Sequence, residues 1–148
     1  MESSPILAQQ QANQGRWLLL TAKKDNVELY IINVYAPNNN APKFWSFLNK
    51  VITNLPKNLT IIQGGDFNLP KDRNLDRISK VNYRVTKSQA QMLNLCKVHN
   101  VSDGWRMHNP MGSNYTLYSY PHDSFSIDYV LIDTQHLQLT TNPNIEPS

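Results

Sequence analysis

Residues 64–68 combine a carboxylate and a carboxamide at a spacing that suits phosphodiester chemistry. The run reads Gly-Gly-Asp-Phe-Asn and directly follows the apolar residues 59–63. The two glycines loosen the backbone, so that Asp66 and Asn68 can point the same way. A carboxylate in this position binds Mg²⁺ or orients a water molecule, and an amide holds a phosphate oxygen. The alternative is an Asx turn that only closes the strand, and the spacing does not decide between the two.

A second polar group stands at the end of another apolar segment. Residues 33–38 read Asn-Val-Tyr-Ala-Pro-Asn, and there the Tyr35 hydroxyl and the Asn38 amide could reach the same site. Many strands end in an aromatic residue followed by Ala-Pro-Asn. For this run taken alone, a purely structural role is therefore the stronger interpretation.

The third candidate is Asp128, which lies within the largely apolar residues 125–133. A carboxylate inside such a strand is costly to bury unless it has a partner. It therefore either orients a histidine or a water molecule or lies on an exposed strand face, and the sequence leaves both open.

Hydrophobic patterns predict the elements that would position these groups. Residues 16–22 and 27–35 are largely apolar around a polar turn, which predicts a hairpin. Residues 42–55 have apolar side chains at helical spacing between two prolines, and residues 59–63 read as a short buried strand that breaks at the glycines. This order predicts a parallel crossover, whose strands carry ligands at their carboxyl ends.

The second half of the chain carries weaker signals. Residues 72–86 are polar and charged, which predicts a long surface loop. A helix is expected from Ser88, which can cap it, to about His99. Residues 115–120 and 125–133 are extended around a Pro-His-Asp-Ser turn, and we expect them to form a second hairpin.

Length and composition limit the possible classes of protein. The 148 residues suffice for one domain and are too few for two ordinary ones. The net charge of +3 is compatible with a polyanionic partner. The single cysteine, Cys96, excludes an internal disulfide, and we expect no disulfide-linked partner. No apolar run is long enough to span a membrane and residues 1–15 lack the order of a secretory signal, so we expect an intracellular protein without a membrane partner.

Five short runs, in this order and at these intervals, together resemble one family. They are the runs at 33–38 and 64–68, Asp103-Gly104-Trp105-Arg106 with Asn109-Pro110, Tyr115-Thr116, and Ser126-Ile127-Asp128-Tyr129. As an ordered set they resemble the endonuclease of LINE-type (non-LTR) retrotransposons, a member of the endonuclease/exonuclease/phosphatase superfamily with DNase I and the apurinic-site endonucleases. The resemblance covers about residues 15–136. It implies an α/β (α+β) fold, here an incomplete four-layer sandwich of two mixed β-sheets flanked by helices.

The resemblance also implies a reaction and a role for each matching residue. The reaction is Mg²⁺-dependent hydrolysis of DNA, in a location that includes the nucleus. Tyr35 would lie against the scissile phosphate, Asp66 would orient or deprotonate the attacking water, and Asn68 would hold the phosphate in the transition state. Asp128 would orient the family's catalytic histidine. The metal would be held weakly by Asp66 and Asn68.

Contacts with nucleic acid are implied at two places. Thr116 would sit close to the cleaved strand, and the hairpin tip at about residues 118–125 resembles the family's groove loop, which recognises shape more than base edges. The residues expected to contact nucleic acid are Asn38, Thr116, Pro121, His122 and Ser124.

Several groups of the family's site have no match in the sequence. The metal-binding glutamate and an early asparagine have no counterpart in residues 1–14, and the closing Ser-Asp-His triplet and a basic residue between positions 126 and 127 are missing. None of the four histidines replaces the catalytic one. We therefore expect residues 1–15 to be a polar segment and residues 16–148 to be a domain truncated at both ends, with poor metal affinity and little or no nicking.

Two other functions stay open at this stage. The chain could be a nucleic-acid-binding remnant that holds DNA without cutting it, or a phosphatase-type member of the same superfamily. The Trp-Arg and Tyr-Thr runs and the hairpin segment favour the retrotransposon type over the phosphatase.

Overall fold

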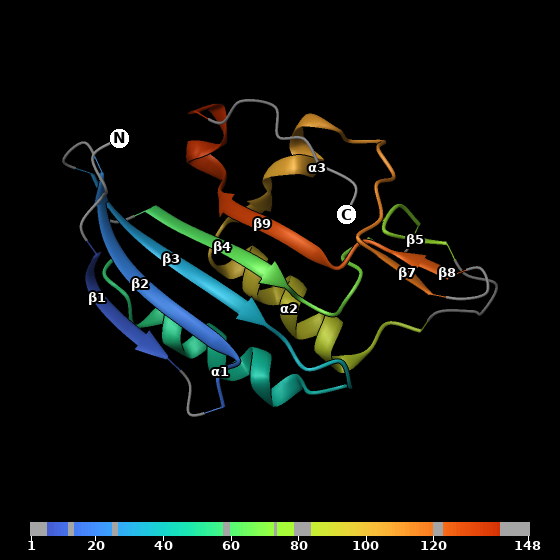
Figure 1. The fold of residues 1–148 in the computed structure, drawn as a ribbon, viewed down its shortest axis with the longest axis horizontal. Helices are drawn as coiled ribbons and strands as arrows, with labels where there is room; N and C mark the ends of the chain where they lie inside the picture. The colour runs from blue at the N-terminus through green and yellow to red at the C-terminus, as the bar shows by residue number, and fades with distance from the viewer. Residues whose placement is uncertain are drawn as a thin grey trace.

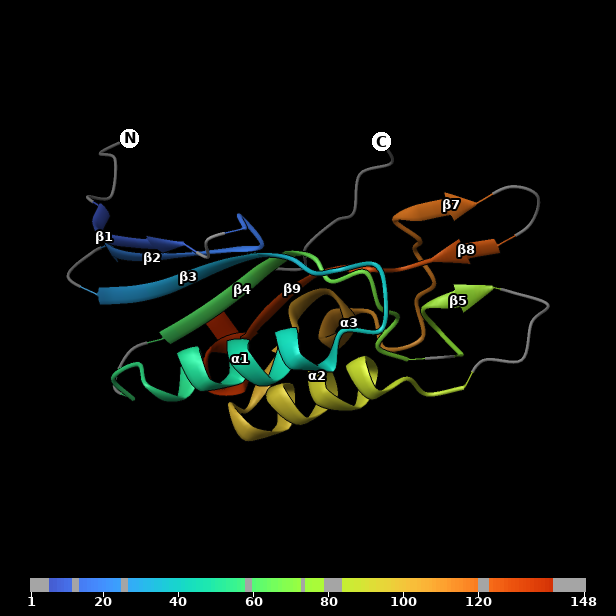
Figure 2. The same ribbon diagram turned by 90° about the horizontal axis from the view of Figure 1, so that it is seen from below.

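The computed structural model describes residues 6–11, 14–24, 27–57, 60–72, 74–78, 84–119 and 123–139, which form two β-sheets, two longer helices and two short helical segments. The larger sheet has the strand order β1-β2-β3-β4-β9-β6, and the smaller one has the order β5-β8-β7 (Figure 1). Helices α1 (Pro42–Thr53) and α2 (Lys87–Val98) cover one face of the larger sheet (Figure 2). No helix of the described residues is long and apolar enough to cross a membrane.

The bounds of the strands and short helices complete this description. The larger sheet contains β1 (Ile6–Gln11), β2 (Trp17–Lys24), β3 (Val27–Tyr35), β4 (Thr60–Asp66), β6 (Val101–Asp103) and β9 (Asp128–Asp133). The smaller sheet contains β5 (Arg77–Ile78), β7 (Leu117–Ser119) and β8 (Asp123–Phe125). A short helix α3 (Gly104–His108) follows β6, and a 3-10 helix η1 (Thr134–Leu139) follows β9.

The first half of the sequence folds as predicted. Strands β2 and β3 form an antiparallel hairpin, and β3, α1 and β4 form a crossover with β3 and β4 parallel. The helix begins at Pro42, whose fixed φ and missing N–H suit a first helical position. Two sheets flanked by helices confirm the predicted fold class.

The main core lies between the larger sheet and its two helices. Alternate residues of β3 point inward, namely Tyr30, Ile32 and Val34, and meet apolar side chains of α1 and α2. The opposite face of β3 and β9 is more open, and Tyr35 and Val130 are 55% and 52% exposed. One face of the sheet therefore holds the fold together, and the other remains accessible.

The predicted second hairpin is present as the antiparallel pair β7 and β8, but its second strand is much shorter than expected. Residues 125–133 divide into β8, which belongs to the smaller sheet, and β9, which lies between β4 and β6 in the larger one. The chain crosses between the sheets at Ser126 and Ile127, both buried. There the Ser126 N–H donates to the Asp76 carbonyl and the Phe67 N–H donates to the Ile127 carbonyl, each at 2.8 Å. These bonds replace the ladder that a continuous hairpin would have formed.

Three local predictions in the middle of the chain also need correction. Strand β4 does not break at its glycines and continues to Asp66. The surface loop expected at residues 72–86 contains β5 and a buried aspartate, Asp76, which is only 2% exposed. The cap of α2 is Thr86, whose hydroxyl accepts from the Gln89 N–H at 3.1 Å, while Ser88 is buried and bonds to Asn40.

Strand β1 lies within residues 1–15, where the sequence pattern predicted only a polar segment. Its backbone pairs antiparallel with β2 at the edge of the larger sheet. The segment is rich in glutamine, a residue type whose pattern carries no clear strand signal.

Candidate active site

Three of the four predicted catalytic residues lie in one row across the larger sheet. Tyr35 pairs with Asp66, and Asp66 pairs with Asp128, at the end of β3, the end of β4 and the start of β9. Neighbouring strands are about 4.8 Å apart, so these positions are immediate neighbours. Because Val34 and Tyr129 point into the core, Tyr35 and Asp128 project from the opposite, accessible face.

A glycine allows the strands to meet closely beside this row. Gly65 has a φ of +127°, and a Cβ atom there would lie 2.1 Å from the Val34 carbonyl oxygen. No other residue type fits that approach. Ala36 directly follows β3, and its N–H donates to the Asp66 carbonyl at 2.8 Å. This bond fixes the ends of β3 and β4 to each other.

The Asx turn weighed against a functional role for residues 64–68 is present. The Asn68 N–H donates to Asp66 Oδ1 at 2.8 Å, and Asn68 Nδ2 donates to the Ala36 carbonyl at 2.7 Å. Asn68 adopts a φ of +51°, which asparagine tolerates better than most residues. The turn leaves Asp66 Oδ2 and the second Nδ2 hydrogen without a bond among the described residues, so the turn and a functional role are compatible.

The carboxylates of the row lie at paired positions, and no cation among the described residues forms an ion pair with them. Burial raises the pKa of Asp66, the Asn68 N–H counteracts this, and the charge of Asp128 raises the pKa further. Two carboxylates at adjacent positions fit the ligand preference of Mg²⁺, which commonly takes one or two carboxylates with phosphate oxygens. The described residues contain no group of three or more His, Cys, Asp or Glu side chains that could hold a metal.

Thr116 positions the third member of the row. Its hydroxyl lies 3.2 Å from the Ile127 N–H and 3.3 Å from the Asp128 N–H, and accepts from both. The Thr116 N–H in turn donates to the Phe125 carbonyl at 2.9 Å. Thr116 therefore fixes the first residues of β9 and, with them, the Asp128 carboxylate.

A pocket of about 340 Å³ adjoins the row beside Asn68. It lies between the loop after β3, the loop after β4 and the small sheet, and its walls combine amides with apolar side chains. Its lining residues are Asn38, Asn39, Asn40, Asn68, Leu69, Pro70, Thr86, Leu117, Phe125 and Ile127.

The residues predicted to contact nucleic acid are only partly brought together. Asn38 lines the pocket with Asn68, and Ser124 lies in β8 next to the pocket residue Phe125. Pro121 and His122 lie outside the described residues. Of the other histidines, His99 ends α2 beside Asn49, while His108 lies in α3 and His136 in η1, so none of these three belongs to the row.

The sequence analysis missed Arg16, which extends the row on its Tyr35 side. The Tyr35 N–H donates to the Arg16 carbonyl at 2.8 Å, and the Arg16 guanidinium carbon lies 5.1 Å from the centre of the Tyr35 ring. An arginine directly before a strand is unremarkable in a sequence. Only the pairing of β2 with β3 shows that it reaches the row.

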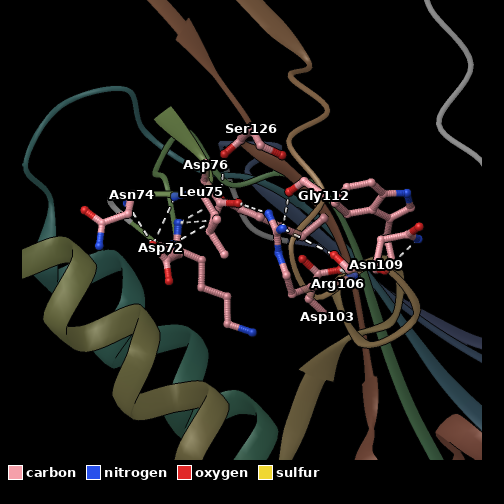
Figure 3. A network of polar contacts seen from close by, with 12 residues as sticks. Asp72, Asn74, Leu75, Asp76, Asp103, Arg106, Asn109, Gly112 and Ser126 are labelled. Carbon is pink, nitrogen blue, oxygen red and sulfur yellow. Dashed lines mark hydrogen bonds and ion pairs between the residues drawn. The ribbon is translucent and has the colours of Figure 1, made fainter. Parts of the chain in front are cut away.

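A second group of charged side chains, drawn in Figure 3, surrounds the buried Asp76 and the partly buried Arg106. Asp76 forms an ion pair with Arg106 and accepts from the backbone N–H groups of Lys71 and Asp72 at 3.1 and 2.7 Å. Arg106 also donates to the carbonyl of Gly112 and, at 3.4 Å, to that of Asn109. We call these residues the Asp76 network.

Tyr129 links the Asp76 network to the Asn68 loop. Its hydroxyl lies 2.6 Å from the Ser126 carbonyl and 3.0 Å from the Leu69 carbonyl, and it accepts from the Lys71 N–H at 2.8 Å. Burial and the charge of Asp76 raise the pKa of Tyr129 far above its usual range, so the phenol stays protonated. The contact with the Tyr129 hydroxyl therefore fixes Leu69, the residue directly after Asn68.

Comparison with known proteins identifies the fold. No family model matches the sequence. Solved structures that match include an AP endonuclease from Archaeoglobus fulgidus (TM-score 0.73, 15% identity, 91% of this chain and 61% of that one). Others are the AP endonuclease LMAP from Leishmania major (TM-score 0.66, 16% identity, 84% and 47%) and the endonuclease domain of TRAS1, a telomere-specific non-LTR retrotransposon (TM-score 0.61, 12% identity, 89% and 58%).

These likenesses confirm the DNase I-like fold that the sequence predicted. The structural neighbours are apurinic-site endonucleases and a retrotransposon endonuclease domain, the kinds of protein named by the resemblance. The chain spans about half to three fifths of the length of these neighbours.

Proposed function

We propose that this chain carries the phosphate- and metal-binding side of a Mg²⁺-dependent DNA endonuclease site of the retrotransposon type, with slow turnover by itself. The observation that supports this proposal is the row of Tyr35, Asp66 and Asp128, which aligns a phenol and two carboxylates on the accessible face of the sheet. Asn68 adds an amide on the turn that directly follows Asp66. This combination suits the hydrolysis of a phosphodiester, which needs an oriented water and stabilisation of negative charge.

Each side chain has a definite part in this reaction. Asp66 accepts a proton from the attacking water or orients it, and the raised pKa of its carboxyl suits a base. The free Nδ2 hydrogen of Asn68 and the Tyr35 hydroxyl donate to phosphate oxygens. Asp66 and Asp128 together would hold Mg²⁺, which supplies positive charge for the phosphate oxygens when it is bound.

The pocket beside Asn68 supports DNA as the substrate. A volume of about 340 Å³ with amide and apolar walls accommodates a nucleoside attached to the phosphate over the row. The net charge of +3 favours a polyanion. A soluble inositol phosphate carries no apolar group for Leu117 and Phe125, and the phosphatase alternative is therefore weaker.

A second candidate function is binding of DNA without cleavage. It is favoured by the composition of the row, which among the described residues contains two carboxylates and no histidine. Catalytic groups act as a unit, so removal of one costs nearly the whole rate.

Nicking of a supercoiled plasmid with Mg²⁺ tests both candidates. We expect little nicking by this chain and clear nicking by a version extended at both ends, abolished there by Asp66→Ala. A salt-titrated DNA-binding assay runs in parallel. Binding without nicking in the extended version would favour the second candidate, and nicking that survives Asp66→Ala would contradict the assigned site.

A further inference from the structure

Arg16, the residue directly before β2, continues the row of site residues beyond Tyr35. It directly precedes Trp17, which pairs with Val34, so it stands opposite Tyr35 at the same edge of the sheet. The hydrogen bond from the Tyr35 N–H to the Arg16 carbonyl confirms this alignment. Across the sheet the order of side chains is therefore Arg16, Tyr35, Asp66 and Asp128.

The guanidinium of Arg16 is held by an aromatic ring and by no carboxylate among the described residues. By contrast, the Arg106 guanidinium pairs with the Asp76 carboxylate. Arg16 instead lies over the Tyr35 ring, with 5.1 Å between the guanidinium carbon and the ring centre. A cation held over an aromatic ring keeps N–H groups that point away from the ring, and these are available to an anion.

The distance from the carboxylates indicates which phosphate this cation can reach. Arg16 lies two strand spacings, roughly 10 Å, from the Asp66 position, and the Tyr35 ring stands between them. A phosphate that is attacked over Asp66 therefore lies on the Asp66 side of this ring. The next phosphate along the same nucleic-acid strand would then lie toward Arg16.

We propose that Arg16 binds a phosphate next to the scissile one and sets the direction in which the DNA strand crosses the row. This inference rests on the proposed function, because it requires a phosphate chain over Asp66. The Tyr35 ring fixes the guanidinium before DNA arrives, so that less side-chain freedom is lost on binding. Arginine matches a phosphate with two parallel N–H groups, which gives geometry as well as charge.

The salt dependence of duplex DNA binding tests this role without any need for cleavage. The logarithm of the association constant falls with the logarithm of salt concentration, with a slope of about −0.9 for each phosphate contact. Arg16→Gln should make the slope shallower by about 0.9 and weaken binding about tenfold at low salt. Lys50→Gln, on the exposed side of α1, removes the same charge away from the row and should change the slope far less.

Two further variants separate a phosphate contact from a change in folding. Arg16→Lys keeps the charge and should restore most of the slope but less of the affinity, since lysine lacks the stacked, forked geometry. In a Tyr35→Ala background, Arg16→Gln should have a smaller effect than in the wild type. The backbone bond from Tyr35 to Arg16 survives these changes, and thermal melting checks that each variant is folded.

The outcomes are distinguishable. A wild-type chain that does not bind duplex DNA would overturn the proposed function together with this inference. A wild-type chain that binds, with Arg16→Gln and Lys50→Gln giving equal slopes, would overturn the role of Arg16 alone.

Discussion

Two regions of the molecule use the same residue types in opposite ways. The row has an arginine, a tyrosine and two aspartates, Arg16, Tyr35, Asp66 and Asp128. The Asp76 network and the side chains that contact it contain the same types: Asp76 and Arg106 pair, the Arg106 N–H donates to Asp103, and the Tyr129 hydroxyl donates to Asp76. In the network a partly buried arginine pairs with a buried aspartate, and further bonds come from the backbone. In the row the arginine stacks on the tyrosine and the two carboxylates face each other.

The charges of the Asp76 network therefore stabilise the fold, whereas the charges of the row are available to bind a ligand. Buried charges are tolerated when they are paired and hydrogen-bonded, and the Asp76 network meets both conditions. Burial and, to a smaller extent, the charge of Asp128 raise the pKa of Asp66, so the two carboxylates of the row slightly disfavour the folded state. Such unfavourable arrangements are typical of functional sites, where a bound cation or substrate relieves them.

The largest expected effect is on stability when the Asp76 network is broken. Asp76→Asn leaves the Arg106 guanidinium without its counter-charge, and we expect a loss of about 3 kcal/mol in the free energy of unfolding, measured by urea denaturation. Asp128→Asn, the matched change in the row, should alter stability by no more than about 0.5 kcal/mol or raise it. Equal losses for the two variants would remove the distinction between the regions.

Asn68 should matter for turnover more than for binding. In an active, extended version of the chain, Asn68→Ala should lower kcat by roughly 10²–10³ while duplex binding changes little, since the amide acts mainly on the transition state. Asn68→Gly separates this effect from backbone strain, because glycine accepts the φ of +51° that alanine does not. A similar loss of kcat in both variants supports the amide, and recovery in the glycine variant would reduce Asn68 to a turn residue.

Tyr129→Phe tests whether the network supports the site from below. The change removes a hydroxyl that contacts the Ser126 and Leu69 carbonyls and the Lys71 N–H, and should cost about 1–3 kcal/mol in unfolding free energy. Hydrogen exchange of the Lys71 and Asn68 amides should become faster relative to those of α1. Uniform acceleration in both places would mean that the hydroxyl stabilises the whole fold and has no particular link to the Asn68 loop.

The smallest predicted effect concerns pH and a residue outside both regions. Burial lowers the pKa of His99, whose Nε2 lies 2.7 Å from Asn49 Oδ1. The unfolded chain then binds a proton more readily than the folded one, so stability should fall as pH decreases below about 6.5. His99→Gln should flatten this slope in urea unfolding measured between pH 5.5 and 7.5, and the same change at exposed His108 should leave it in place. A slope that His99→Gln leaves unchanged would contradict the assignment.

The crossover could be read from the sequence, and with it the position of the row. Apolar runs on both sides of a helix predicted β3 and β4 as parallel neighbours, which brings Tyr35 beside Asp66. Asp128 was found as a carboxylate in an apolar strand, but its pairing with Asp66 depended on β9 entering the larger sheet. The sequence pattern suggested a hairpin there, because alternation does not reveal where a strand changes sheets.

The Asp76 network and Arg16 could not be found in this way. Asp76 lies among charged residues in the sequence, a pattern that indicates an exposed segment. In the structure it is buried and paired with an arginine 30 positions later. Arg106 was noted only through a resemblance, without a contact. Side-chain partners at such separations depend on the tertiary structure, and hydrophobic periodicity carries no information about them.

The most direct test of the central claim is the effect of Mg²⁺ on stability. A cation that binds only the folded state raises the unfolding free energy, by about 1.4 kcal/mol at ten times its Kd. Urea unfolding with and without Mg²⁺ should show this gain for the wild type and for Asp133→Asn, a change at the other end of β9. The gain should disappear in Asp66→Asn and in Asp128→Asn. The same gain in all four proteins, or none in the wild type, would show that the row is not a cation site.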